Sequence, residues 1–266
     1  MRKIAVLDQQ TIDKIAAGEV VERPSSIVKE LVENAIDAGA TAVTVEITDG
    51  GKKMIRITDN GGGMERDQVP LAFLRHATSK IRSVEDLYQV KSLGFRGEAL
   101  PSIASVSNFQ LLTRPADEEF ATSIRIDGGE QSECQQTGGQ AGTTVIVENL
   151  FFNVPARRKF LRTNATEGRY INELLTRLAL SRPDVRFKLV SNDKEVLSTP
   201  GNGSLFDAIT ALYGKKVSDE LLKVDFTGTD VKITGYIGKP TLLKGTRQWQ
   251  TFMVNGRIIN LSLIHI

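Results

Sequence analysis

The chain has 266 residues, of which 40% are hydrophobic and 25% are charged, a balance typical of a globular protein with a sizeable core. Its formal net charge is only +2, so composition by itself points to neither a nucleic acid nor a membrane as partner. One cysteine and two histidines are too few for an internal disulfide or for a zinc site built from these residues. Since no apolar run is long enough to cross a bilayer, we expect a cytoplasmic protein without a membrane partner.

The strongest local pattern lies in residues 24–39, where apolar side chains recur at helical spacing. These side chains are Ile27, Val28, Leu31, Val32, Ala35 and Ile36. Ser25 and Ser26 are candidates for the N-terminal cap, and Gly39 provides the stop. The pattern predicts a helix with one buried face.

A hairpin follows, because residues 42–48 and 53–59 alternate in strand fashion on either side of a glycine-rich turn. Asp59 then stands at the end of the second strand. From residue 60 to 97 the apolar periodicity weakens and glycines gather, a composition typical of loops around a site.

The rest of the chain predicts one α/β layer followed by a second, smaller unit. Helices are expected at 98–106, 167–181 and 205–213, and strands at 108–114, 121–127, 143–150 and 186–191, with further strand patterns up to residue 259. Small and polar residues at 198–204 predict a linker. We therefore expect domains at 1–200 and 201–266.

Glu30, Asn34 and Asp37 lie four and three residues apart, so they project from the side of the first helix opposite its apolar residues. Taken alone, such a stripe is more often a solvated face. In phosphoryl transfer, however, a carboxylate can polarise the attacking water while an amide oxygen binds magnesium. Glu30 and Asn34 could divide these two tasks.

Two glycine-rich segments add to that interpretation. Asp59 precedes Gly61, Gly62 and Gly63, so a ligand could approach the backbone while the carboxylate accepts a hydrogen bond from an amino group such as that of adenine. Taken alone, residues 59–63 are equally typical of an ordinary glycine-rich turn. Gly94 and Gly97 precede a helix whose free amides could face phosphate oxygens, although one such loop is weak evidence. No Walker-type GxxxxGK[ST] motif is present, so these pieces predict nucleotide chemistry of another kind.

In this order the segments resemble the GHKL ATPase superfamily, which includes gyrase-type topoisomerases, heat-shock chaperones, histidine kinases and MutL proteins. Four stretches resemble the MutL DNA mismatch-repair family in particular. They are IAAGEVVERPSSIVKELVENAIDAGA, RHATSKI, SLGFRGEAL and NVPARRKFL. The resemblance extends over most of residues 4–190. It implies an α/β fold of the Bergerat type, with a mixed sheet and helices on one face, followed by a ribosomal-protein-S5-like α/β domain.

The resemblance also implies roles for individual residues. Glu30 matches the general base, Asn34 the magnesium ligand and Asp59 the reader of the adenine amino group. The other expected ATP-binding positions are Asp37, Gly61 and Gly63, the phosphate-contacting Lys80, the lid residues Gly94, Phe95, Arg96, Gly97, Glu98, Ala99 and Leu100, and Thr143 near the adenine.

For the whole protein, the resemblance implies a slow magnesium-dependent ATPase that dimerises with ATP, clamps DNA, and works with the mismatch-recognition protein MutS and a downstream nuclease or helicase at the nucleoid. The family's second domain contributes a lysine from beyond the VNGR strand. Here VNGR is 254–257 and the sequence ends nine residues later, so hydrolysis is expected to be impaired. Residues 261–266, LSLIHI, match the translation of a transposase adapter end, so we expect a truncated gene fragment rather than a native strand.

Arg157, Arg158, Lys159 and Arg162 form one basic cluster, which predicts nonspecific contacts with DNA phosphates. The alternative for this cluster is a solvated face. Phe151, Phe152, Phe160 and Trp249 are expected in the core or at a domain interface rather than as stacking platforms. Two other functions remain open: a non-catalytic ATP-gated module for dimerisation and DNA binding, and the ATPase domain of a gyrase-type topoisomerase.

Overall fold

The computed structural model describes residues 6, 8–80, 86, 93–94, 97–242, 245–246 and 249–259. The predictions for Phe95, Arg96 and residues 261–266 lie outside this part of the chain. Among the helices that it describes, none combines the length and the hydropathy that crossing a bilayer requires.

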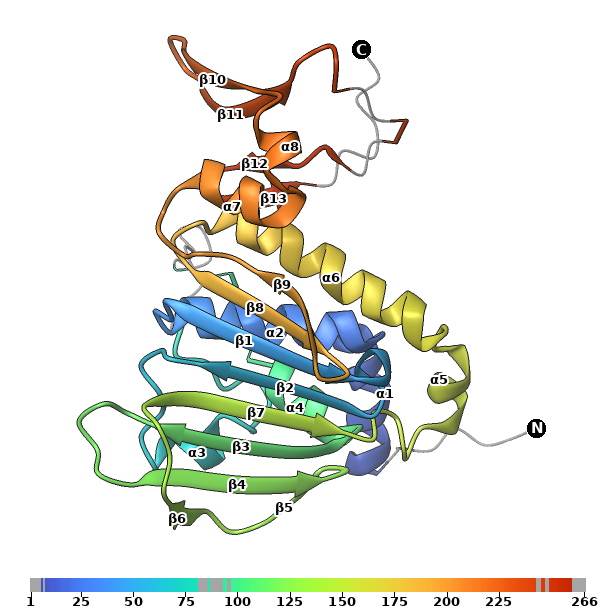
Figure 1. The fold of residues 1–266 in the computed structure, drawn as a ribbon. Helices are drawn as coiled ribbons and strands as arrows, with labels where there is room; N and C mark the ends of the chain where they lie inside the picture. The colour runs from blue at the N-terminus through green and yellow to red at the C-terminus, as the bar shows by residue number, and fades with distance from the viewer. Residues whose placement is uncertain are drawn as a thin grey trace.

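A mixed sheet forms the centre of the first domain, with strand order β5-β4-β3-β7-β2-β1-β8-β9 and with β6 paired to β4 (Figure 1). Its strands are β1 (Ala42–Thr48), β2 (Met54–Asp59), β3 (Asn108–Arg114), β4 (Ala121–Asp127), β5 (Glu130–Gln131), β6 (Gln135–Thr137), β7 (Gly142–Glu148), β8 (Arg186–Ser191) and β9 (Lys194–Ser198). β1 runs antiparallel to β2 and parallel to β8. Val43, Val45 and Ile47 alternate as predicted and point into the core.

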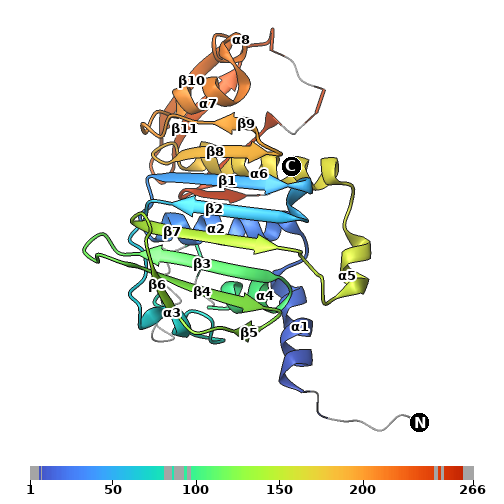
Figure 2. The same cartoon turned by 60° about the horizontal axis from the view of Figure 1, so that its bottom comes forward.

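Helices cover one face of this sheet, as Figures 1 and 2 show from two directions. They are α1 (Gln9–Val20), α2 (Pro24–Asp37), α4 (Ala99–Ser105) and α6 (Asn164–Ser181), with the short α3 (Gln68–Leu71) and α5 (Pro155–Phe160) near the edges. α2 packs on β1 and β2 between α4 and α6, while α1 packs beside α4. This is the predicted α/β class with helices on one face.

α2 forms as predicted, because Ile27, Val28 and Val32 are fully buried on its sheet-facing side. Its start differs from the expectation. Arg23 is the capping residue and makes no side-chain cap, and Pro24 opens the helix, so neither Ser25 nor Ser26 caps it. Pro at the first position needs no partner for an N–H, which removes part of the need for a cap.

Several elements were not predicted or begin elsewhere, among them the short strands β5 and β6. α1, α5 and β9 were not expected, and α6 begins at Asn164 rather than at residue 167, because Thr163 caps it by accepting a hydrogen bond from the Thr166 amide at 3.3 Å. β9 is short and mostly exposed, and it follows Asn192 and Asp193 in left-handed conformation. Short exposed strands carry too little alternation to be detected in a sequence.

The segment predicted as a linker is held by the first domain. The Thr199 amide donates to the Phe187 carbonyl at 2.9 Å, and the Gly203 amide donates to the Pro183 carbonyl at the same distance. Gly201 has a φ of +69°, and a side chain there would meet the Arg186 backbone at 2.4 Å. This turn is therefore packed rather than free, and a boundary at residue 200 stays a prediction.

The remaining described residues form a smaller α/β unit above α6 in Figure 1. It contains α7 (Leu205–Tyr213), α8 (Lys215–Ser218) and two hairpins, β10 (Leu221–Thr227) with β11 (Lys232–Gly238) and β12 (Phe252–Val254) with β13 (Arg257–Ile259). Tyr213 and Trp249 pack their rings 4.8 Å apart, which joins α7 to the segment before β12. Trp249 contacts this unit through that ring, but it is 43% exposed, so its expected place in a core or interface stays a prediction.

Candidate active site

A cavity of about 1430 Å³ lies beside α2, over the middle strands β3, β7 and β2 of the sheet. The sequence-predicted residues that line it are Glu30, Asn34, Asp37, Asp59, Gly63, Lys80, Gly94, Gly97, Glu98, Ala99, Leu100 and Thr143. These residues come from separate parts of the chain. Glu30 and Asn34 thus face the same hollow as Asp59 and the loop that contains Gly94 and Gly97, called the glycine loop below.

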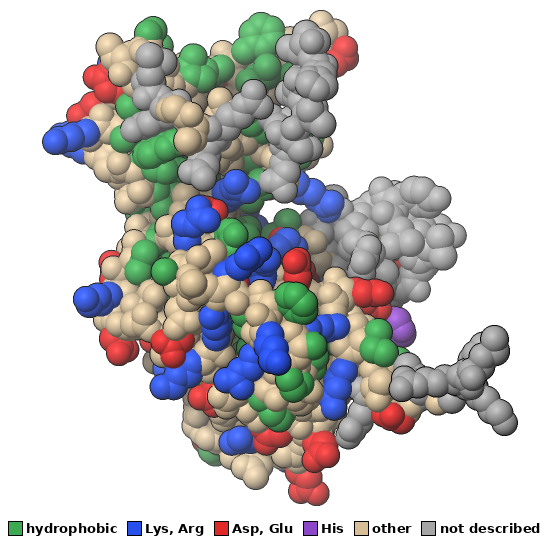
Figure 3. All heavy atoms as spheres, turned by 90° about the vertical axis from the view of Figure 1, so that its right-hand side faces the viewer, with side chains coloured by type: hydrophobic (Ala, Val, Ile, Leu, Met, Phe, Trp, Pro, Cys, Tyr) green, Lys and Arg blue, Asp and Glu red, His purple; other side chains and the backbone are tan. Residues whose placement is uncertain are grey.

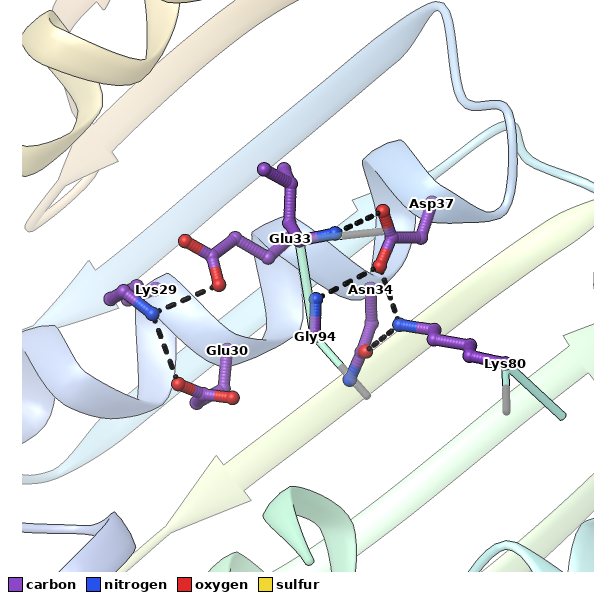
Figure 4. Close-up of polar contacts among 8 residues, drawn as sticks. Lys29, Glu30, Glu33, Asn34, Asp37, Lys80 and Gly94 are labelled. Atoms are coloured by element: carbon purple, nitrogen blue, oxygen red, sulfur yellow. Dashed lines mark hydrogen bonds and ion pairs between the residues drawn. The ribbon is translucent and has the colours of Figure 1, made fainter. Parts of the chain in front are cut away.

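The polar side of α2 turns toward this cavity (Figure 4). Lys29 donates to Glu33 Oε2 at 2.9 Å and to Glu30 Oε1 at 3.2 Å. The Glu30 side chain retains 29% of its exposure and the Glu33 side chain only 11%. Lys29 therefore fixes the direction of the Glu30 carboxylate, a contact that the sequence did not predict.

Burial and charge act against each other in this group. Burial raises the pKa of Glu33, and the hydrogen bond from Lys29 only partly offsets that effect. Burial lowers the pKa of Lys29, but the hydrogen bond to Glu33 and the nearby charge of Glu30 outweigh it, so the net pKa is raised. The ammonium form of Lys29 is thus favoured at neutral pH.

Lys80 binds the other end of the stripe. Its Nζ donates to Asn34 Oδ1 at 3.0 Å and to Asp37 Oδ2 at 2.5 Å. The Leu93 amide donates to Asp37 Oδ1 at 3.0 Å and the Gly94 amide to Asp37 Oδ2 at 3.2 Å. Asp37, whose side chain is 9% exposed, thereby joins α2 to both Lys80 and the glycine loop.

The donor set is compatible with magnesium bound together with a phosphate ligand. Among the described residues, no group of three or more His, Cys, Asp and Glu could form a cage for a metal by itself. Mg²⁺ in proteins commonly takes one or two side-chain oxygens and completes its shell with phosphate and water. Asn34 lines the cavity, and its Oδ1 accepts a hydrogen bond from the Lys80 ammonium, which would have to move before a metal ion could bind this oxygen.

Asp59 lies on the floor of the cavity, where β2 ends. Its Oδ1 accepts a hydrogen bond from the Gly61 amide at 2.8 Å. Burial raises the pKa of Asp59, while the amides of Gly61 and Thr143 pull it down by a smaller amount. Gly61 itself does not line the cavity: it supports the carboxylate, whereas Gly62 and Gly63 reach the surface of the hollow.

Two glycines are required by close backbone contacts. Gly63 has a φ of +71°, and a Cβ there would lie 2.5 Å from the Arg114 carbonyl oxygen. Gly97 has a φ of +64°, and its Cβ would lie 2.2 Å from the Ala77 carbonyl oxygen. Only glycine adopts this conformation without strain, and here it also avoids a collision.

Several site residues were missed in the sequence. Thr113 is 1% exposed, and its hydroxyl contacts the Thr143 hydroxyl at 3.0 Å and accepts from the Met64 amide at 2.9 Å, so it supports the floor. His76 also lines the cavity, with its Nδ1 3.2 Å from Glu98 Oε1. Thr113 had no sequence signal of its own, because a threonine in a strand is ordinary.

The four residues of the predicted DNA-binding cluster are not all exposed: three are, and Arg157 packs against α1. Lys and Arg side chains gather on the face of the molecule seen in Figure 3, the side on which α5 lies in Figure 1. Arg158, Lys159 and Arg162 are exposed, as phosphate contacts require. Arg157 differs: its Nη2 donates to the Ile15 carbonyl at 3.2 Å and its guanidinium lies on α1.

The three phenylalanines in and near α5 also differ in exposure. Phe151 is fully buried, in agreement with its expected place in the core. Phe152 is 42% exposed and Phe160 is 85% exposed, so the described residues do not bury Phe160 in any core or interface. Phe160 is the last residue of a short helix and points outward from it, which the apolar character of the residue did not indicate.

Family models match two parts of the chain. Residues 22–140 match the model described as "Histidine kinase-, DNA gyrase B-, and HSP90-like ATPase", and residues 209–265 match "DNA mismatch repair protein, C-terminal domain". The first match contains the polar side of α2, the floor and the glycine loop. The second begins within α7.

Curated relatives and solved structures agree with these matches. The DNA mismatch repair protein MutL of Agathobacter rectalis is 54% identical over 99% of this chain and 41% of its own length, and that of Desulforudis audaxviator is 51% identical over 97% and 46%. The chain thus spans less than half the length of these relatives. The Aquifex aeolicus MutL ATPase domain complexed with ADP superposes with a TM-score of 0.70 at 33% identity, covering 90% of this chain and 84% of that one. The N-terminal domain of a DNA repair protein gives a TM-score of 0.78 at 25% identity, covering 94% and 78%.

Proposed function

The chain belongs to the MutL family of DNA mismatch-repair proteins, and we propose that its first domain binds ATP with magnesium in the cavity beside α2 and hydrolyses it slowly. The observation that carries this proposal is the convergence of Glu30, Asn34, Asp59 and the loop through Gly97 on one hollow. The ADP complex of the related Aquifex domain, which this chain covers over most of its length, supports nucleotide as the ligand.

Each side chain then has a task set by its chemistry. The Glu30 carboxylate, held by Lys29, orients a water molecule and accepts its proton. The Asp59 carboxylate accepts a hydrogen bond from the adenine amino group, and Thr143 lies beside the base. Asn34 Oδ1 would hold magnesium, which supplies positive charge against the phosphates.

Lys80 and the glycine loop serve the phosphates. The Lys80 ammonium can leave Asn34 for a phosphate oxygen, because four-carbon stems reorient easily and phosphate is a strong anionic acceptor. Gly94 and Gly97 both line the cavity, and because they have no side chains a phosphate can approach the backbone there closely. Asp37, which binds Lys80 and the Gly94 amide, holds this wall against α2.

For the whole protein, the proposal is a switch that couples mismatch recognition to later repair steps. Its partners would be DNA, contacted through exposed cations such as Arg158 and Lys159, a second copy of the chain in the presence of ATP, MutS, and a downstream nuclease or helicase. Association with the nucleoid follows from that role. The two relatives reported above are mismatch-repair proteins, so we do not propose a topoisomerase.

The test is Glu30→Ala, measured for ATP affinity and for phosphate release. ATP affinity should change little, while turnover should fall by roughly 10²- to 10⁴-fold, the contribution of a positioned general base. Glu22→Ala is the matched control, because Glu22 lies just before α2, is exposed and does not line the cavity. Turnover in Glu30→Ala equal to that of the unchanged chain would remove Glu30 from this role.

A non-catalytic, ATP-gated module is separated by the same measurements. ATP binding and ATP-dependent dimerisation without measurable phosphate release from the unchanged chain would support the module. Absence of ATP binding would contradict both functions.

A further inference from the structure

One wall of the cavity includes the end of α1, which packs against α4. Glu19 and Val20, the last two residues of this helix, line the hollow. Ala17 and Val21 are fully buried and anchor this end, whereas Ile15 is 57% exposed and contributes little packing. The position of the last turn of α1 therefore decides part of the shape of the nucleotide cavity.

An arginine from a distant part of the chain lies on this turn. The guanidinium of Arg157, in α5, covers Gly18 so closely that a Cβ at Gly18 would stand 1.8 Å from Nη2 and 2.5 Å from the guanidinium carbon. Nη2 also donates to the Ile15 carbonyl at 3.2 Å. The Phe151 ring lies on the other side, 6.0 Å from the guanidinium carbon. α1 and the segment from Phe151 to α5 thus hold Arg157 between them.

The amino acids at both positions suit this contact. Gly18 does not have a positive φ, so its backbone does not require glycine, and glycine is the poorest helix former after proline. What glycine provides here is room for a flat guanidinium. A cation near the carboxyl end of a helix also interacts favourably with the helix dipole. Nη1 is buried without a hydrogen-bond partner among the described residues, so packing and charge, more than a hydrogen-bond network, hold the group in place.

We propose that Arg157 is a positioning residue for the nucleotide site: by lying on Gly18 it holds the last turn of α1 where Glu19 and Val20 complete the cavity wall. The proposal rests on the proposed binding of ATP in this cavity. It also moves Arg157 out of the predicted DNA-binding cluster, whose other members are exposed. α5 then performs two tasks with adjacent side chains.

The first experiment measures Arg157→Ala without nucleotide, by hydrogen exchange of backbone amides. The amides at the end of α1 should exchange faster than in the unchanged chain, while those of β1 and β2 should not change. MgATP affinity of the same variant should fall by at least about fivefold, the lower end of typical coupling between sites, with little change in the melting temperature. Arg169→Ala is the control, because Arg169 is exposed on α6, pairs with Glu173 and does not line the cavity, and it should leave both measurements unchanged.

The second experiment tests the contact itself with Gly18→Ala, alone and together with Arg157→Ala. Alanine improves the helix propensity, yet its Cβ displaces the guanidinium, so Gly18→Ala alone should also loosen α1 and weaken MgATP binding. In the double variant no guanidinium remains to be displaced, so the loss should not exceed that of Arg157→Ala. Losses that multiply would show that the two residues act independently, and would overturn the proposal.

Unchanged exchange at α1 in Arg157→Ala would overturn it as well, as would unchanged MgATP affinity. If Arg157→Ala does not fold, Arg157→Lys replaces it, since lysine keeps the charge without the flat contact and should change both measurements in the same direction. Failure of the unchanged chain to bind ATP would instead contradict the proposed function, while the exchange measurement would still test the contact.

Discussion

The carboxylate of Asp59 lies in a mostly buried position, where its ionised form is less stable than in water. It lies where a strand ends against the cavity, and burial raises its pKa although two amides stabilise its charge. Because the folded pKa is above the unfolded value of 3.8, the unfolded chain releases its proton first as the pH rises. The contribution of Asp59 to stability is therefore largest in acid and is lost as the pH rises through the folded pKa.

Ligand binding should have the opposite dependence on pH. Only the ionised carboxylate is purely an acceptor, so ATP affinity should fall as the pH is lowered through the raised pKa of Asp59. Asp59→Asn should remove that dependence and weaken ATP binding by roughly 10- to 100-fold, since a hydrogen bond to a charged group contributes about 1.5–3 kcal/mol. Its melting temperature at neutral pH should not decrease. Calorimetric titration against pH checks the first result, and an affinity of the variant that still falls in acid would assign the titration to another group.

Asn34 should determine how much magnesium contributes to binding. Asn34→Ala removes the amide oxygen that we assign to the metal, so ATP affinity in this variant should become nearly the same with Mg²⁺ as with a chelator. In the unchanged chain, affinity should be higher with Mg²⁺. Fluorescence titration with a labelled ATP measures both. Equal affinities with and without the metal in both proteins would refute the assignment.

The loop after β2 offers two adjacent glycines with different surroundings. Gly63 has a positive φ and touches the Arg114 backbone, whereas Gly62 has no positive φ, and its nearest neighbour, the Ala38 carbonyl oxygen, lies 3.6 Å from an added Cβ. Gly63→Ala should destabilise the chain by about 1–3 kcal/mol for backbone strain alone, with more from the collision. Gly62→Ala should change stability by less than about 1 kcal/mol. Urea unfolding of the two variants measures both changes in the free energy of unfolding. Equal losses of stability in the two variants would contradict this prediction.

Elements with strong periodicity could be predicted from the sequence, and those stabilised by distant contacts could not. α2 and the hairpin of β1 and β2 carry their own patterns of buried residues. α1 has no such pattern: it contains Gly18, and its docking depends on Arg157. The strands β5 and β6 are two and three residues long and fully exposed, so they have no apolar alternation to detect.

The site follows the same rule. Glu30 and Asn34 were predictable because helical spacing places them on one side, and Asp59 because its strand ends there. Lys29 was missed: its i,i+4 spacing to Glu33 favours an ion pair on one helix face, but its contact with the adjacent Glu30 could not be foreseen. Such bridges depend on rotamers, which the sequence does not specify.

At the scale of the molecule, the basic face around α5 determines how the chain would bind DNA. If the exposed side chains of Arg158, Lys159 and Arg162 contact phosphates, replacing all three by Gln should reduce the slope of log affinity against log salt concentration by about three. Arg125→Gln is the control, because Arg125 is exposed on β4 and paired with Asp127. The affinity for a DNA duplex, measured at several salt concentrations, gives the slopes. An unchanged slope in the triple variant would show that DNA binds to another surface of the chain.

The parallel pairing of β1 with β8 also has a consequence for how the chain folds. Every residue pair in that ladder joins the beginning of the first domain to its last strands, for example Val45 to Leu189. Contacts with such high sequence separation form slowly, because a long loop must close before they stabilise anything. β8 must therefore be synthesised before the sheet under α2 is complete. On a nascent chain, β1 therefore lacks its partner on one side until residues 186–191 have been made, although every described residue that lines the cavity precedes them.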